Sequence, residues 1–144
     1  EGLRAQGYSL LVQGEASRNA LLTLHRERCA HDQPSILLGT GSFAEGLDLP
    51  GKLLTNLLIT KVPSAVPTAP IEAAQAEWIS ARGGNPFLQI TLPDASRKLV
   101  QACGRLIRQE ADRGRVIILD RRLVTRRYGG QLLAALPPFR RRIE

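Results

Sequence analysis

A glutamine and two arginines stand at helical spacing inside an otherwise apolar stretch of this 144-residue chain. In the segment QACGRLIRQEADRG, Gln101, Arg105 and Arg108 are separated by four and three residues, and Arg97 lies four residues earlier. These side chains share one face of a helix predicted from Asp94 to Gln109. Guanidinium groups are planar, always charged and able to bond phosphate oxygens in pairs. The pattern indicates a phosphate contact or, alternatively, a solvated cationic helix face.

A second candidate is the glycine-rich segment GTGSFAEGLDLPG, residues 39–51, which directly follows the strand-like run SILLG. Open α/β sheets bind ligands beyond the carboxyl ends of their strands. Glycines allow close approach to the backbone, and hydroxyls and N–H groups can hold a sugar-phosphate chain. The candidate contacts are Thr40, Gly41, Ser42, Glu45, Gly46 and Asp48. The segment lacks the Gly-Lys-Ser/Thr ending of a phosphate-binding loop. A plain tight connection ending in the Pro50–Gly51 turn is the alternative.

Charge is distributed unevenly along the chain. Residues 1–96 contain seven Lys or Arg and nine Asp or Glu, whereas residues 97–144 contain thirteen and four. This asymmetry favours a polyanionic partner, with a solubilising surface as the alternative. One basic cluster could follow a DNA backbone or face solvent or a partner domain. It consists of Arg121, Arg122, Arg126 and Arg127. Residues 137–144 are expected to form a basic tail.

Composition limits the remaining functions. The sequence contains no run of about 18 apolar residues and no secretory leader pattern, so we expect neither a membrane span nor export. Its two cysteines, Cys29 and Cys103, lack a CxxC spacing and are expected to be small core residues of a reduced cytosolic protein. His25 and His31 are expected at the surface, and no metal site is predicted.

The order of predicted elements indicates an α/β fold. Strands are predicted near residues 8–14, 35–39, 53–60 and 115–120. Helices are predicted over 17–30, 71–84, 94–109 and 127–136, and a short helix end is expected before Gly7. Prolines make residues 61–70 irregular, and residues 86–93 are expected to be extended. Such alternation implies a parallel sheet covered on both faces. Four strands are few for this architecture, which predicts further sequence at the front.

The segments GSFAEGLDLPG and, about 50 residues later, QACGRLIR resemble motifs V and VI of superfamily 2 helicases of the XPD/DinG type. The stretches LLVQGE, LPDAS and DRRLVTRRYGGQLLAALPPF are similar to the bacterial DinG-like branch. The resemblance covers nearly the whole chain. It implies a RecA-like, three-layer α/β/α fold with a mostly parallel sheet that lacks its first strand. Residues 1–144 would then be most of the second, C-terminal motor domain.

The resemblance also implies a function, which is ATP-driven 5′→3′ unwinding of DNA in bacterial replication or repair. ATP and Mg²⁺ would be held mainly by a first RecA-like domain, and Arg105 and Arg108 would act as arginine fingers beside Gln101. The motif V residues would couple the nucleotide to single-stranded or forked DNA; they are Gly41, Ser42, Glu45, Gly46 and Asp48. The protein would work in the cytoplasm, near the nucleoid, with a replication or repair protein as a further partner.

Departures from the family pattern define the alternatives. Walker A, Walker B and the four-cysteine iron–sulfur insertion are absent, so this fragment alone is expected to be inactive, while an iron–sulfur cluster in the parent protein stays possible. Where relatives have KLPF, this chain has KVPSAVP, Lys61 to Pro67. Trp78 is expected to pack its helix against the domain rather than to stack on a base. The alternative function is a non-catalytic module that binds nucleic acid or a replication or repair protein.

Overall fold

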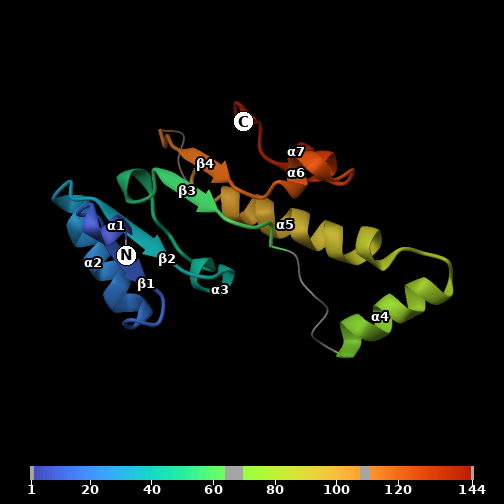
Figure 1. Ribbon diagram of the computed structural model, residues 1–144. Helices are drawn as coiled ribbons and strands as arrows, with labels where there is room; N and C mark the ends of the chain where they lie inside the picture. The colour runs from blue at the N-terminus through green and yellow to red at the C-terminus, as the bar shows by residue number, and fades with distance from the viewer. Residues whose placement is uncertain (1, 64–69, 108–110, 144) are drawn as a thin grey trace. The chain divides into compact units, whose positions relative to one another are not determined.

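The computed structural model describes residues 2–63, 70–107 and 111–143 (Figure 1). The chain forms two compact units. The first contains Glu1–Thr55 and Ile107–Gly114, and the second contains Asn56–Leu106 and Arg115–Glu144. The backbone therefore passes from one unit to the other three times. Each unit combines helices with a pair of parallel strands, so the predicted α/β class is confirmed.

The first unit is built on strands β1 (Ser9–Val12) and β2 (Ser35–Leu38), which pair in parallel with Leu11 opposite Leu37. Aliphatic side chains favour these short strands because they pack well on a pleated surface. Helix α2 (Arg18–Ala30) connects the two strands, as a parallel crossover requires. The core of this unit consists of Leu11, Leu21 and Phe43, with Leu37 and Leu47 packed against it.

The ends of the helices in this unit follow local capping chemistry. Helix α1 (Gly2–Ala5) is followed by Gly7 at φ 83°, the left-handed conformation predicted for that glycine. The hydroxyl of Ser17 accepts a hydrogen bond of 3.3 Å from the backbone N–H of Ala20 and so caps α2. Both helix boundaries predicted from these residues are confirmed.

His25 corrects the prediction that both histidines lie at the surface. Its side chain is 5% exposed and bridges two other elements of the first unit. Nδ1 lies 2.8 Å from the Ser35 hydroxyl, and Nε2 lies 2.8 Å from the Leu53 carbonyl oxygen. The imidazole is buried because both ring nitrogens have partners there. His31 is exposed, as predicted.

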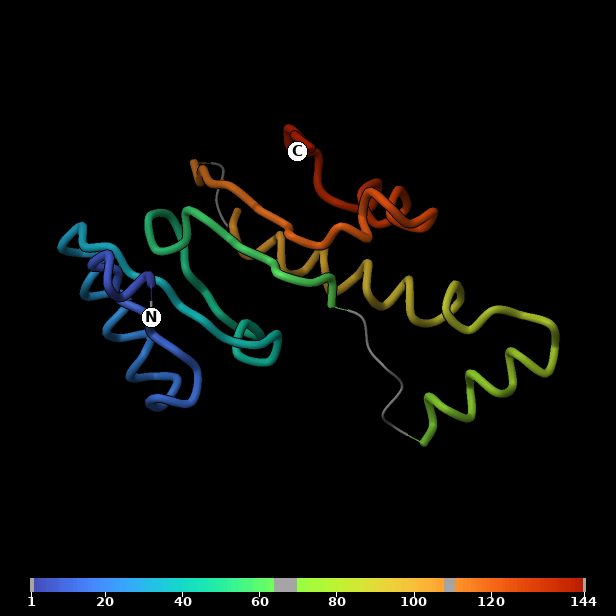
Figure 2. The backbone as a smooth tube through the Cα atoms, viewed as in Figure 1, coloured from blue at the N-terminus to red at the C-terminus, as the bar shows by residue number. Residues whose placement is uncertain are grey.

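The second unit is built on strands β3 (Asn56–Ile59) and β4 (Arg115–Ile118), again parallel (Figure 2). Three helices accompany the pair, namely α5 (Leu92–Cys103), α6 (Arg122–Thr125) and α7 (Gly129–Ala135). Helix α4 (Pro70–Ala81) and a π-helical turn, Phe87–Thr91, precede α5.

The core of the second unit lies between α5 and one face of the β3–β4 pair. Leu99 and Cys103 on α5 are completely buried, and Ile59, Val116 and Ile118 pack against the same cluster. Burial raises the pKa of the Cys103 thiol, because the thiolate would lose its hydration there. Cys103 is therefore the small core residue that the sequence predicts, and both cysteines are free thiols.

The segment 86–93 is helical, so the prediction of an extended chain is wrong. Pro86 has helical backbone angles, and the Asn85 side chain accepts a hydrogen bond of 3.3 Å from the N–H of Leu88. Pro86 begins the helical segment, and Pro93 lies at the start of α5, directly after the π-helical turn. Neither proline makes the segment extended.

Candidate functional site

The glycine-rich segment directly follows β2, as predicted, but it contains a short helix. Helix α3 (Gly41–Ala44) buries Phe43, whose ring packs on the α-carbon of Gly39. A Cβ on Gly39 would lie 2.6 Å from Cδ1 of that ring, so a larger residue would displace the phenylalanine. Phe43 and the buried Leu49 therefore anchor the segment, while its polar residues Thr40, Ser42, Glu45 and Asp48 are exposed.

The polar residues at the start of the segment form a connected, exposed group. The backbone N–H and the hydroxyl of Thr40 donate to Oε1 of Gln13, at 2.8 and 3.0 Å. The Thr40 and Ser42 hydroxyls lie 2.8 Å apart. Gln13 was not a predicted site residue; its position immediately after β1 was the signal, because β1 and β2 end side by side. Two hydroxyls are thus held at a strand end, where they can contact a polar ligand.

Arg18 holds the second half of the same segment. Its guanidinium donates to the backbone carbonyl of Glu45 and lies over the Phe43 ring, 5.9 Å from the centroid. Gly46 follows at φ 69°, in the left-handed region that glycine adopts without strain. Gly41, Glu45, Gly46 and Asp48 are exposed. Arg18 was also missed from the sequence, because a helix-start arginine carries no distinctive spacing.

The cationic face predicted on α5 is shorter than expected. The helix ends at Cys103, and Gly104 bonds back to Val100. Glycine favours this stop because it has low helix propensity. Arg105 therefore lies in the turn beyond the helix, where its N–H donates to the Ala102 carbonyl at 3.1 Å. The predicted helix from Asp94 to Gln109 is wrong at its C-terminal end.

The two residues of the predicted phosphate contact that the structure describes, Gln101 and Arg105, have different surroundings. Gln101 is exposed on the last turn of α5, and Arg105 is half-buried. Arg108 lies outside the described residues. Arg97, earlier on the helix, bonds the Asp94 carboxylate at 2.5 Å, and Lys98 bonds the same carboxylate at 2.8 Å. Local ion pairing thus occupies Arg97.

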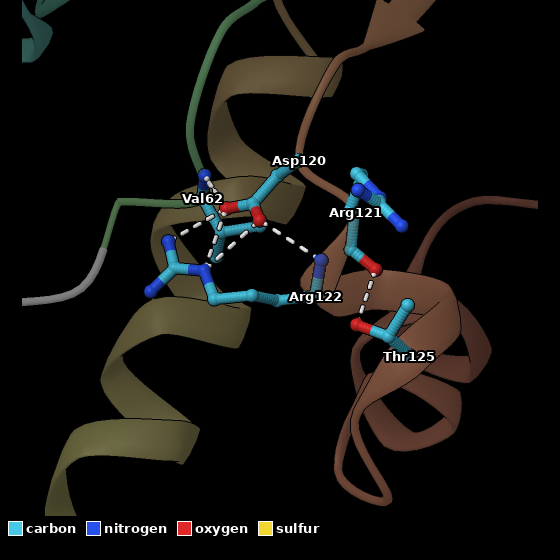
Figure 3. Close-up of polar contacts among 5 residues, drawn as sticks. All are labelled: Val62, Asp120, Arg121, Arg122 and Thr125. Atoms are coloured by element: carbon cyan, nitrogen blue, oxygen red, sulfur yellow. Dashed lines mark hydrogen bonds and ion pairs between the residues drawn. The ribbon is translucent and has the colours of Figure 1, made fainter.

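The basic cluster after β4 divides into one structural arginine and three exposed ones. Asp120 accepts hydrogen bonds from the Val62 N–H at 2.9 Å and from Nη2 of Arg122 at 2.6 Å (Figure 3). Figure 3 shows the Arg121 side chain directed away from this carboxylate. Arg121, Arg126 and Arg127 are exposed. Contact of this cluster with DNA stays a prediction, and Arg122 already has a partner.

The electrostatics of Asp120 agree with this geometry. The Arg122 guanidinium, followed by the backbone N–H groups of Val62 and Arg122, holds the pKa of the Asp120 carboxyl well below its usual range. The hydrogen bond to the Asp120 carboxylate raises the pKa of Arg122. Both groups are charged at neutral pH, and together they tie the end of β3 to the start of α6.

Trp78 departs from the packing predicted for it. Helix α4 buries none of its side chains against the described residues, and the indole is 59% exposed. The Arg82 guanidinium lies over the indole, 3.8 Å from the ring centroid. Residues 64–67 of the neighbouring KVPSAVP stretch lie outside the described residues.

The parts of the chain that the structure describes contain neither a metal-binding cluster nor a membrane-spanning helix. No three His, Cys, Asp or Glu side chains there are arranged to hold a metal ion. None of the helices in those parts is long and apolar enough to cross a membrane.

Comparison with known proteins establishes the family. The family model of the helicase C-terminal domain matches residues 1–139, so the chain belongs to that family. Over 137 residues, 95% of this chain, it is 61% identical to an ATP-dependent DNA helicase DinG of Photobacterium profundum. Over 130 residues it is 47% identical to the DinG helicase of Salmonella typhimurium and 45% identical to that of Escherichia coli K12. The chain spans about a fifth of the length of these relatives.

Proposed function

We propose that this chain is the second motor domain of an ATP-dependent DNA helicase of the DinG type. The carrying observation is the 61% identity to a DinG helicase across 95% of the chain, a span that includes both candidate segments. In the proposed protein, a first motor domain holds the nucleotide, and this chain supplies arginine side chains that contact the same nucleotide. The work would take place on DNA in a bacterial cytoplasm.

Arg105 and Arg108 are the proposed arginine fingers. Charge builds on the oxygens of a phosphoryl group during its transfer, and guanidinium groups placed against those oxygens lower the barrier. Gln101 stands four residues before Arg105 in the sequence and is proposed to contact the same phosphate. Arg105 lies beyond the end of α5 and is half-buried.

ATP and Mg²⁺ are proposed to be held mainly by the first motor domain. Mg²⁺, when bound there, neutralises phosphate charge during transfer. Any iron–sulfur cluster of the parent protein would need cysteines outside this chain, which has two.

The segment after β2 is the proposed DNA contact. Thr40 and Ser42 present hydroxyls at a strand end, and such groups bond phosphate and sugar oxygens without reading base sequence. The exposed Arg121, Arg126 and Arg127 are proposed to add charge along the strand. The motif V residues around Glu45 and Asp48 would then link DNA to nucleotide.

Strand displacement by the full-length protein tests this proposal. We expect a duplex with a 5′ single-stranded tail to be unwound when ATP is present and a duplex with a 3′ tail to stay intact. Arg105→Ala is expected to abolish unwinding while leaving affinity for single-stranded DNA within about threefold. A full-length protein that binds DNA but does not hydrolyse ATP would favour the alternative, a non-catalytic binding module.

A further inference from the structure

A buried carboxylate joins the two segments that the proposed function assigns to nucleotide and to DNA. Asp112 is 7% exposed, and its Oδ1 accepts a hydrogen bond of 3.1 Å from the backbone N–H of Gly51. Gly51 is the last residue of the motif V segment, and Asp112 follows the proposed finger Arg108 by four residues. The contact therefore brings together the ends of two motifs that are about 60 residues apart in sequence.

The position of Asp112 in the chain makes this contact unusual. Ile107–Gly114 belongs to the first unit, whereas the residues on either side of it belong to the second. Ile107 comes four residues after the end of α5 at Cys103, and β4 begins at Arg115. Its packing within the first unit thus includes a buried hydrogen bond to the turn that begins at the last residue of motif V.

The turn that begins at Gly51 is fixed at both of its ends. Gly51 begins a 3₁₀ turn, Gly51–Leu53, and has φ 58°, which few other residues adopt. His25 fixes the other end of the turn through the Leu53 carbonyl, at 2.8 Å. Leu49, between the turn and Asp48, is 4% exposed. Gly51 is three positions after Asp48, so the Cα atoms of the two residues lie at most about 11 Å apart.

We propose that Asp112 is a positioning residue that couples the arginine segment to the DNA-contacting segment through Gly51. This inference rests on the proposed helicase function. We expect a nucleotide bound at the arginines to shift the position of Asp112, and the Asp112–Gly51 bond would pass that shift to motif V. In the reverse direction, DNA held at Ser42 biases the position of the arginines, because a coupling between two sites is reciprocal.

The test measures ATP turnover of the full-length protein with saturating single-stranded DNA, divided by turnover without DNA. We expect Asp112→Ala to lower this ratio at least fivefold. Asp112→Asn should keep at least half of the wild-type ratio, since the amide oxygen can still accept from Gly51. Asp32→Asn is the matched control: Asp32 pairs with Lys52 on the exposed side of the same turn, at 3.2 Å, and this variant should keep the wild-type ratio.

The outcomes separate coupling from support of the fold. A purely structural role would lower turnover with and without DNA in proportion and leave the ratio unchanged, which would overturn the inference. An equal fall in the Asp32→Asn variant would overturn it as well. If wild-type protein shows no ATP turnover at all, the proposed function fails, and the inference fails with it.

A second measurement needs no variant and covers the case in which Asp112→Ala does not fold. Hydrogen exchange of the peptide that contains Gly51 is followed in wild-type full-length protein, without DNA, before and after addition of a non-hydrolysable ATP analogue. We expect exchange at this peptide to change at least twofold on nucleotide binding. Unchanged exchange at Gly51, with the nucleotide bound, would overturn the proposal.

Discussion

The two units of this chain contain similar strand pairs that end in opposite ways. Beyond β2, Phe43 is the one buried residue of the short helix α3, and the hydroxyls of Thr40 and Ser42 are exposed. Beyond β3 and β4, the Asp120 side chain, 6% exposed, bonds the backbone of Val62 and the guanidinium of Arg122. At the first edge, the end of β2, polar side chains are exposed. At the second edge, the ends of β3 and β4, polar groups bond to one another and hold the fold together.

This difference separates the arginine that stabilises the fold from the arginines that lie exposed on the surface. Arg122 belongs to the same cluster as Arg121, Arg126 and Arg127, and composition alone treats the four alike. The structure gives Arg122 a nearly buried carboxylate, whereas the other three are exposed. Buried, bonded charges are costly to disrupt and exposed ones are not. Mutation of the two edges should therefore affect stability very differently.

The largest expected effect on stability comes from Asp120→Ala. It removes the acceptor for the Val62 N–H and leaves the Arg122 guanidinium without its carboxylate. We expect the free energy of unfolding to fall by about 2–4 kcal/mol, with Arg122 partly relieved by solvent. Chemical denaturation of the 144-residue chain measures this loss. A loss below about 0.5 kcal/mol would show that the second edge is not held by Asp120.

The pH dependence of stability sharpens the same point. The folded-state pKa of Asp120 is depressed, so the stability that its charge contributes is fully present above the usual carboxyl value of about 4. It is lost as pH falls below that value toward the depressed folded-state pKa. Asp120→Asn lacks this contribution. We expect wild-type chain to be more stable than Asp120→Asn by about 1–2 kcal/mol at pH 6.

That gap should narrow steadily between pH 4 and pH 2.5 in thermal unfolding experiments. A constant gap over this range would mean that the Asp120 charge does not stabilise the fold. A gap that widened on acidification would give the opposite sign and would contradict the assignment of Arg122 as its main partner.

The smallest expected effect comes from Ser42→Ala at the first edge. Its hydroxyl contacts Thr40 on an exposed surface, so the free energy of unfolding should change by at most about 0.5 kcal/mol. In the full-length protein, affinity for single-stranded DNA should fall about two- to fivefold, as expected when a phosphate contact is lost. A stability loss comparable to that of Asp120→Ala would remove the distinction between the edges.

Several elements could be predicted from sequence because each carries a local signal. Aliphatic runs bounded by glycine or turn residues mark strands such as β2 and β4, and Ser17 marks the start of α2. The candidate segments are likewise recognisable, since motif V follows a strand and Gln101 and Arg105 keep helical spacing. The roles predicted for these residues stay proposals.

Other features depend on contacts that a local pattern does not contain. The burial of His25 follows from Ser35 and Leu53, which are distant in sequence, although its spacing of four from Leu21 and Cys29 was a signal. The bond between Asp112 and Gly51 joins residues about 60 apart and has no periodic signature. The end of α5 at Cys103 was hidden because Arg105 and Arg108 continue the helical spacing beyond it.

The maximal rate of ATP hydrolysis by full-length protein carrying Arg105→Ala tests the central claim most directly, with Arg97→Ala as the control. Arg97 lies on the same helix but pairs with Asp94. At saturating ATP and DNA, we expect Arg105→Ala to reduce kcat by 100-fold or more and to change affinity for ATP by less than about fivefold. Arg97→Ala should retain wild-type turnover. Equal rates for Arg105→Ala and Arg97→Ala would contradict the account.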